Sequence, residues 1–334
     1  MTNNHRILEI KKLRTVFTGN HGRFHAVDEV DLEVYEGETL GIVGESGSGK
    51  SVTSLSIMGL LPRSIASIEQ GEIRLEGREL AGLSEEEMRR LRGKDIAMIF
   101  QEPMTSLNPV FTIGEQLSEP LRQHTRLTRK ERKKKIIETL QAVGIPRAEE
   151  IIHEYPHQLS GGMRQRVMIS LAILCDPKLL IADEPTTALD VTIQAQILEL
   201  LKQIKQERQM AIMLITHDLG VVAEMCDRVV VMYAGKVVES AEVRTLFSDP
   251  KHPYTRGLLA SIPDRNKRKN EMVSIPGHVP RPDELPAGCA FAPRCPEAQD
   301  KCLVQKPPLL RLDRQECRCW LYENVEGEVN KIAR

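Results

Sequence analysis

The sequence predicts an α/β fold, followed by a small cysteine-rich extension at the C-terminal end of its 334 residues. A glycine-rich loop follows the strand-like run TLGIV, at 39–43, and precedes an apolar helix-like run. Strand-like, helix-like and strand-like runs then alternate over 178–217, in the order typical of a parallel sheet covered by helices. Five of the seven cysteines lie between Cys289 and Cys319, and this cluster predicts the extension.

The spacing of apolar residues predicts the order of the elements. Alternation over 27–44 predicts two strands separated by a turn at Glu36 and Gly37. The runs GEIRLEG and DIAMIF are short and β-like, and a polar, charged stretch from about Thr112 to Ile152 is helix-like. A strand-like run, DRVVVMYAGKVVES, closes this part of the chain. Charge and proline then increase from about Ser261, which predicts a linker before the cysteines.

Composition limits the partners of the protein. Forty-six basic and 47 acidic side chains leave a net charge of -1, so the positive field that attracts nucleic acid is missing, and we expect no nucleic-acid partner. The sequence shows no signal-peptide pattern and no run of roughly 18 apolar residues, so we expect a cytosolic protein with only indirect membrane contact. The basic run at 125–135 fits either a lipid-facing patch or a solvated helix face.

The loop GESGSGKS, at 44–51, fits the phosphate-binding pattern G-x-x-x-x-G-K-[ST] in the required strand–loop–helix context. Its glycines allow successive backbone N–H groups to point at phosphate oxygens, and the helix dipole reinforces them. The lysine can reach the β- and γ-phosphates, and the last serine can ligate Mg²⁺. The sequence therefore predicts a site for a nucleotide and Mg²⁺ at Gly44, Ser46, Gly47, Gly49, Lys50 and Ser51.

An acidic pair, Asp183 and Glu184, follows a buried strand at its carboxyl end, where open α/β sheets present their ligands. Asp183 is suited to hold Mg²⁺ through water, and Glu184 to polarise the attacking water. His217 ends the next strand and can hydrogen-bond the γ-phosphate or the attacking water. A solvated acidic pair and a structural histidine are the alternatives.

The segment LSGGMRQRV, at 159–167, indicates one family among the ATPases that carry a phosphate-binding loop. With GESGSGKS, QEPMTSLNP, LLIADEPTTALD and ITHDLG in this order, the chain from about 5 to 260 resembles the nucleotide-binding subunit of ABC transporters. The resemblance implies a nucleotide-binding domain over 1–260, with a mixed-sheet core and a helical subdomain at about 102–175. The linker and the cysteine-rich, metal-binding extension then occupy 261–334.

In this family two ATP molecules lie between two head-to-tail subunits, and the signature loop of one subunit binds ATP held by the other. The resemblance thus implies that Ser160, Gly161 and Gly162 bind the γ-phosphate of ATP on a second ABC ATPase subunit, either identical or different. Bare N–H groups at a helix start suit that role. Met163 departs from the commonest signature, which has glutamine, but methionine is frequent in the peptide-importer branch.

The same resemblance assigns three further residues. Gln101 is expected to sense Mg²⁺ and the γ-phosphate, and it is a candidate ligand of Mg²⁺ and a catalytic residue. Asp190 is expected to link the two ATP sites across the dimer. Phe17 is expected to lie against adenine, and a core phenylalanine is the alternative.

The segment HPYTRGLLASIP and the cysteine pattern resemble the dipeptide and oligopeptide permease ATP-binding subunits of bacteria. This implies an ATP-hydrolysing subunit on the cytoplasmic face of the membrane, with two transmembrane permease subunits and an extracytoplasmic peptide-binding protein. Transport of nickel or another solute by the same motor, or a soluble ABC ATPase without a transport role, are the alternatives.

Four cysteines, Cys289, Cys295, Cys302 and Cys319, form the candidate metal centre. Four thiolates can hold zinc or an iron–sulfur cluster, and the spacing does not decide between the two. The resemblance implies a [4Fe-4S] cluster and selects Cys319, directly before WLY, over Cys317. We expect the centre to stabilise the extension without taking part in hydrolysis. Free or buried thiols, or a redox or metal sensor, are the alternatives.

Overall fold

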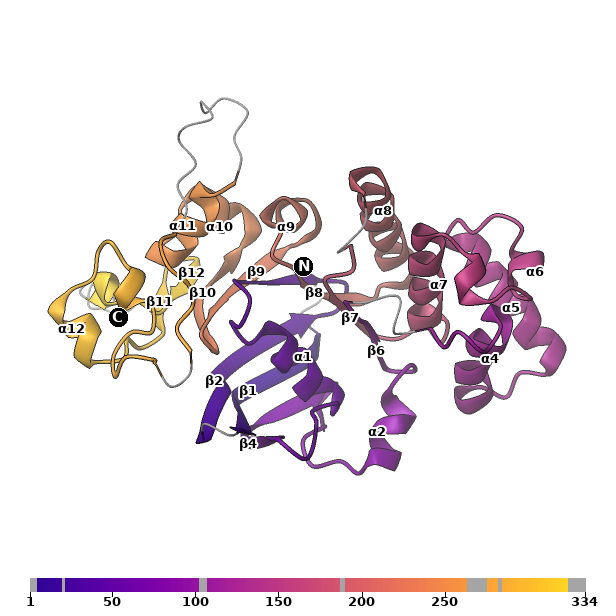
Figure 1. The fold of residues 1–334 in the computed structure, drawn as a ribbon, viewed down its shortest axis with the longest axis horizontal. Helices are drawn as coiled ribbons and strands as arrows, with labels where there is room; N and C mark the ends of the chain where they lie inside the picture. Colours follow the sequence, from indigo (N-terminus) through magenta and orange to yellow (C-terminus); the bar gives the residue numbers. More distant parts are fainter. Residues whose placement is uncertain are drawn as a thin grey trace. The chain divides into compact units, whose positions relative to one another are not determined.

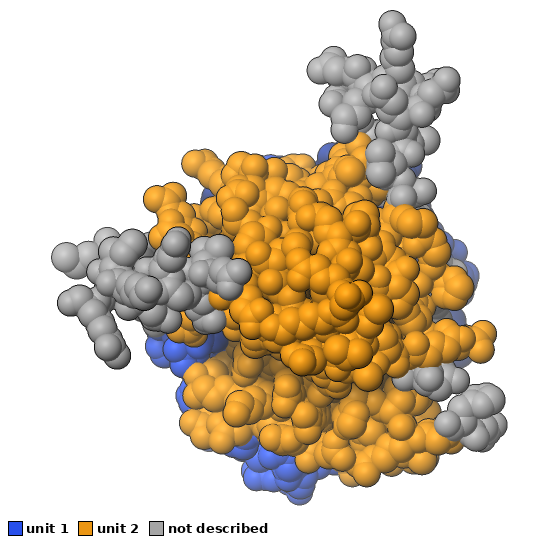
Figure 2. Space-filling view, turned by 90° about the vertical axis from the view of Figure 1, so that its left-hand side faces the viewer, with its two compact units in different colours: residues 1–8, 33–38, 75–214 blue, residues 9–32, 39–74, 215–334 orange. Residues whose placement is uncertain are grey.

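The computed structural model forms two compact units, each built from several segments of the chain (Figure 2). The first unit contains residues 1–8, 33–38 and 75–214, and the second contains 9–32, 39–74 and 215–334. The structure describes residues 5–19, 22–101, 107–186, 190–262, 275–281 and 284–323. The predicted start of the helical subdomain at 102, most of the predicted linker and the chain beyond 323 lie outside the described residues.

The first unit combines parallel strands with a group of helices (Figure 1). Strand β6 pairs with β7 in parallel, and β8 is the next strand beyond β7. All residues of β7 and β8 are buried, as expected of parallel strands covered on both faces. The elements are β5 (Arg78–Glu79), α2 (Glu85–Leu91), β6 (Ile96–Ile99), α4 (Ile113–His124), α5 (Arg129–Ala142), α6 (Ala148–Ile151), η1 (Pro156–Gln158), α7 (Gly161–Ile173), β7 (Leu179–Asp183), α8 (Val191–Arg208) and β8 (Ala211–Ile215).

The helix-like stretch predicted from Thr112 to Ile152 divides into three helices. Two of them start at capping boxes: the hydroxyls of Thr112 and Thr128 each accept a hydrogen bond from the backbone N–H three residues later. In return, the glutamate at that third position accepts one from the N–H of the threonine. Each box satisfies two N–H groups that a helix start leaves unpaired, which explains why the chain breaks into separate helices at these points.

The second unit contains most of the N-terminal strands, the glycine-rich loop and the C-terminal region. One sheet has the strand order β2-β1-β4, and the turn at Glu36 and Gly37 separates β2 from β3, as predicted. In the other sheet β3 pairs with β9 in parallel, and β9 pairs with β10 antiparallel. The elements are β1 (Arg6–Gly19), β2 (Gly22–Tyr35), β3 (Thr39–Val43), α1 (Lys50–Met58), β4 (Ala66–Leu75), α9 (Leu219–Met225), β9 (Arg228–Tyr233), β10 (Lys236–Glu242), α10 (Val243–Ser248) and α11 (Pro253–Ala260).

The C-terminal region adds two strands that the sequence did not predict. Strand β12 pairs antiparallel with β10, and β11 pairs antiparallel with β12, so this sheet runs β3-β9-β10-β12-β11. The region is therefore joined to the core through backbone hydrogen bonds. Its elements are η2 (Ala292–Arg294), α12 (Asp300–Val304), β11 (Leu310–Leu312), β12 (Gln315–Cys317) and η3 (Trp320–Tyr322).

Helix α11 begins at a buried histidine. The side chain of His252 is almost fully buried, and its Nδ1 accepts a hydrogen bond from the N–H of Tyr254 at 3.1 Å. The N–H of His252 itself donates to the buried carboxylate of Glu239 at 2.9 Å. Burial, together with the positive charge of Arg256, lowers the pKa of His252 to about 3. The ring is therefore neutral in the folded protein at neutral pH.

We expect the folded state to lose stability as the pH falls below about 6.5, because the unfolded chain then binds a proton that folded His252 does not. The loss from this residue alone is about 2 kcal/mol by pH 5 and continues towards pH 3. The variant His252→Asn keeps a side-chain acceptor at the helix start and removes the titration. Urea unfolding at about pH 7.5 and about pH 5 measures the free energy of unfolding of the wild-type chain and of His252→Asn. Equal losses of unfolding free energy on acidification would contradict this role.

Candidate functional site

The glycine-rich loop connects β3 to α1 in the second unit. Helix α1 begins at Lys50, and the preceding residue, Gly49, is its N-cap in the left-handed conformation with φ 101°. The N-cap residue is a glycine and has no side-chain oxygen to cap the helix. A helix N-terminus of this kind attracts anions through its N–H groups and its dipole.

The loop is tightly curled, and two of its glycines have no room for a side chain. A Cβ atom on Gly44 would lie 2.2 Å from the carbonyl oxygen of Met232, and one on Gly49 would lie 2.7 Å from that of Ala26. The Nζ of Lys50 donates hydrogen bonds to the carbonyl oxygens of Gly44 and the next residue, at 2.7 and 3.0 Å. These contacts close the loop around its own lysine, as the phosphate-binding pattern requires.

The acidic pair lies at the end of β7 in the first unit. Asp183 is the last, buried residue of the strand, and Glu184 follows it with a left-handed φ of 48°. Residues other than glycine hold this backbone conformation only when their surroundings enforce it, and such residues cluster at functional sites. The side-chain amide of Gln101, which follows β6, donates to the carboxylate of Glu184 at 3.0 Å. The structure thus brings together two of the three predicted catalytic residues.

The signature segment starts helix α7 in the same unit. Ser160 is the N-cap, and its hydroxyl accepts a hydrogen bond from the N–H of Met163 at 3.3 Å. Ser160 and Gly161 are exposed, so this helix start is accessible. Further along the helix, the buried Gln165 donates to the carbonyl oxygen of Pro185. Because Pro185 directly follows the acidic pair, this hydrogen bond joins the signature helix to the acidic segment.

Two more predicted residues lie beside these elements. Asp190 is the N-cap of α8, and its carboxylate accepts a hydrogen bond from the N–H of Ile193 at 2.9 Å. Gly162 lies close to the same isoleucine, since a Cβ atom on it would be 3.2 Å from Cγ2 of Ile193. The starts of α7 and α8 therefore meet at Ile193.

The remaining predicted residues belong to the second unit. His217 is exposed and follows β8. The half-buried ring of Phe17, in β1, stacks on the ring of Phe24 with 5.9 Å between centroids. The loop residues Gly44, Ser46, Gly47, Gly49, Lys50 and Ser51 lie in this unit, and Gln101, Ser160, Gly161, Gly162, Asp183, Glu184 and Asp190 lie in the first.

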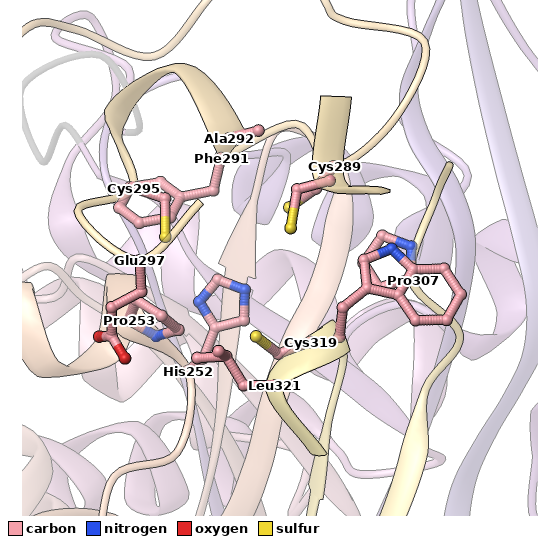
Figure 3. Close-up of a pocket in the computed structure, with 12 residues that line it drawn as sticks. His252, Pro253, Cys289, Phe291, Ala292, Cys295, Glu297, Pro307, Cys319 and Leu321 are labelled. Carbon is pink, nitrogen blue, oxygen red and sulfur yellow. The ribbon is translucent and has the colours of Figure 1, made fainter. Parts of the chain in front are cut away.

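The four candidate metal ligands, Cys289, Cys295, Cys302 and Cys319, line one pocket beside His252 (Figure 3). Its volume is about 20 Å³, which is room for roughly one water molecule. Among the residues that the structure describes, no group of three or more His, Cys, Asp or Glu side chains is placed to hold a metal ion. The prediction of an iron–sulfur or zinc centre at these cysteines is therefore wrong.

Protonation gives a physical reason for this correction. Burial raises the pKa of the Cys289 and Cys295 thiols above the ordinary value, and raises that of Cys319 to about 11. Metal ions bind the thiolate, so a metal ion at this pocket would have to displace these protons. Cys317 lies in β12, opposite Glu239 of β10, and is fully buried. The number and spacing of cysteines indicated their proximity but not their protonation.

Two contacts of Glu45 in the loop were not predicted. The N–H of Glu45 donates to the hydroxyl of Tyr254 at 2.8 Å, and the carboxylate of Glu45 pairs with the guanidinium of Arg294. Tyr254 belongs to the segment HPYTRGLLASIP, whose family resemblance implied no role for the tyrosine. No sequence signal connects Glu45 with Arg294, because they are 249 positions apart.

Similarity to known proteins covers nearly the whole chain. A family model described as "ABC transporter" matches residues 27–187, and one described as "Oligopeptide/dipeptide transporter, C-terminal region" matches residues 238–302. The chain is 55% identical to the oligopeptide transport ATP-binding protein AppD of Bacillus subtilis, over 96% of this chain and 98% of AppD. It is 49% identical to the dipeptide transport ATP-binding protein DppD of the same organism, over 95% of each chain.

A solved structure agrees with these relatives. The dimeric, post-hydrolysis ATP-binding cassette MJ0796, bound to ADP and Pi, matches with a TM-score of 0.64 and 29% identity. The match covers 71% of this chain and 99% of that cassette. Within the described ranges, none of the helices combines the length and apolar character that crossing a bilayer requires.

We expect Gly49→Ala to destabilise the protein more than Gly47→Ala. Both glycines have positive φ, 101° and 80°, so alanine at either position costs about 1–2 kcal/mol of backbone strain. A Cβ atom on Gly47 meets nothing within 4 Å, whereas one on Gly49 meets backbone atoms that cannot rotate away. This collision adds roughly 1–3 kcal/mol for Gly49→Ala alone. Urea unfolding of both variants tests the difference, and equal losses would show that the loop is not sterically closed at Gly49.

Proposed function

Because the chain belongs to the ABC transporter ATP-binding proteins that carry the oligopeptide/dipeptide transporter C-terminal region, we propose that it drives the uptake of oligopeptides or dipeptides. The chain is an ABC ATPase. ATPases of this kind dimerise and work with transmembrane permeases. The observation that carries the peptide proposal is similarity over nearly the full length to oligopeptide and dipeptide transport ATP-binding proteins. The matched C-terminal region favours peptides over nickel or another solute, and over a role outside transport.

We further propose the surroundings in which this motor works. Its place is the cytoplasmic face of the cell membrane, beneath two permease subunits, and an extracytoplasmic peptide-binding protein delivers the cargo. A second ABC ATPase, identical or different, completes the ATP sites. The nucleotide-binding domain spans 1–260, with its helical subdomain at about 102–175, and 261–334 form an extension of that domain. Pairing of β12 with β10 supports an extension that is folded onto the domain.

The phosphates of ATP are proposed to bind in the curled loop of 44–51. The N-terminus of α1, which begins after a glycine, and the positive charge of Lys50 suit a bound triphosphate. Ser51, Gln101 and Asp183 would hold Mg²⁺, which neutralises charge on the β- and γ-phosphates. Phe17 offers the aromatic face for adenine. From the partner's signature loop, copies of Ser160, Gly161 and Gly162 would complete the γ-phosphate site, with Asp190 between the two sites.

Hydrolysis is proposed to depend on the carboxylate of Glu184. An ionised carboxylate accepts a hydrogen bond from the attacking water and increases its nucleophilicity. The hydrogen bond from Gln101, at 3.0 Å, holds one carboxylate oxygen of Glu184. His217 is the candidate for a further hydrogen bond to the γ-phosphate or the water.

We expect Glu184→Gln to reduce ATP hydrolysis by the assembled transporter by about 10²–10⁴-fold, because the amide cannot act as a base. Nucleotide binding should persist, since the phosphate loop is unchanged. Phosphate release and binding of an ATP analogue measure the two effects. Glu199→Gln is the control, because Glu199 is an exposed residue of α8. Wild-type hydrolysis by Glu184→Gln would contradict the assignment of the base.

The Glu184→Gln variant also tests the cargo. Uptake is compared between cells whose only copy of the protein is wild type and cells whose only copy is Glu184→Gln. Uptake of labelled dipeptides and oligopeptides should fall for one peptide class, while the variant still accumulates in the membrane complex. Unchanged uptake of both classes would refute the peptide proposal. Labelled nickel would then be the next solute to measure.

A further inference from the structure

A buried ion pair connects the C-terminal region to the phosphate loop within the second unit. The Nη1 and Nη2 atoms of Arg294 lie 2.7 and 3.1 Å from the two carboxylate oxygens of Glu45. This two-pronged geometry is the strongest that arginine and a carboxylate form. The Arg294 side chain is only 6% exposed, and that of Glu45 is 28% exposed. Glu45 directly follows Gly44, the first glycine of the loop.

The arginine is held from several sides. Its Nε donates to the carbonyl oxygen of Pro276 at 2.9 Å, and its guanidinium stacks 5.8 Å from the ring centre of Tyr233. Three residues upstream, Phe291 packs edge-on against Tyr233, with 5.3 Å between ring centroids, and lies 5.4 Å from Tyr254. Rings packed in this way have little freedom to move. The position of Arg294 is therefore fixed by the fold of the C-terminal region.

Glu45 is held from the loop side as well. Its N–H donates to the hydroxyl of Tyr254 at 2.8 Å, and its carbonyl oxygen accepts from Nζ of Lys50 at 3.0 Å. Its carboxylate faces Arg294. The backbone of this residue thus contributes to the closed loop, and its side chain contributes a negative charge beside a site for a triphosphate. A negative charge without its partner opposes the binding of an anion nearby.

We propose that Arg294 is a positioning residue of the ATP site, through which the C-terminal region sets the affinity for nucleotide. Arg294 neutralises the Glu45 carboxylate and fixes the first turn of the loop, although it does not itself belong to the phosphate-binding motif. This inference rests on the proposed binding of ATP by the loop.

The test is a double-mutant cycle on nucleotide affinity in the full-length chain. Arg294→Met should raise the Kd of a fluorescent ATP analogue by roughly tenfold, because the carboxylate of Glu45 loses its partner. Glu45→Gln alone should change the Kd by less than about threefold. Adding Glu45→Gln to Arg294→Met should restore the Kd to within about threefold of wild type, because the uncompensated charge is gone. In the assembled transporter, Arg294→Met should raise the KM for ATP more than it lowers kcat.

The control is Arg256→Met, which removes another arginine of the same unit. Arg256 pairs with Glu297 at 2.9 Å, and both side chains are about two-fifths exposed. Its loss should leave the nucleotide Kd unchanged. Thermal unfolding of each variant establishes that the chains compared are folded.

The outcomes separate this inference from the proposed function. Failure of the wild-type chain to bind the analogue would refute ATP binding by the loop. Wild-type binding with an unchanged Kd for Arg294→Met would overturn the inference alone. A third result is that Arg294→Met raises the Kd and Glu45→Gln does not restore it in the double variant. That result would also overturn the inference, because the arginine would then act only as a structural support.

Discussion

A phosphate-binding loop works only while its backbone is held in a conformation that most residues avoid. Here Gly44, Gly47 and Gly49 all have positive φ, and the loop wraps closely over its own lysine. Neither the loop nor the short helix that follows is stable in this form by itself, since nine residues are too few for an independent helix. The second unit must therefore supply the contacts that hold the loop closed.

Those contacts come from chain segments that are distant in sequence. The carbonyl oxygens of Ala26 and Met232 lie so close to loop glycines that a side chain there would collide with them. The hydroxyl of Tyr254 binds the N–H of Glu45, and the guanidinium of Arg294 binds its carboxylate. The N-terminal strands, β9, α11 and the C-terminal region thus converge on one loop. In this arrangement the C-terminal region contributes to the contacts that hold the loop.

The sequence predicted the elements whose formation depends on local pattern. The turn at Glu36 and Gly37 and the buried strands β7 and β8 follow from apolar spacing. A hydrogen bond joins Gln101 and Glu184; the sequence assigned Glu184 to hydrolysis from the acidic pair, and Gln101 from the family resemblance. Motifs with fixed spacing carry this information because their geometry is local.

Other features depend on contacts that spacing does not encode. Strands β11 and β12 have three residues each, too few for a pattern of alternation, and they form because the edge of β10 offers backbone partners. The cysteines do gather at one pocket, but their protonation depends on burial, which sequence does not show. The pairing of Glu45 with Arg294 depends on the complete fold of the second unit.

The central claim is that the C-terminal region holds the phosphate loop closed. Amide hydrogen exchange of residues 44–49, compared between the nucleotide-free wild-type chain and Arg294→Met, tests it most directly, because exchange reports local opening. The account predicts faster exchange of the loop amides in the variant, with unchanged exchange in the buried strands β3 and β9. Equal exchange of the loop amides in the two chains would contradict it.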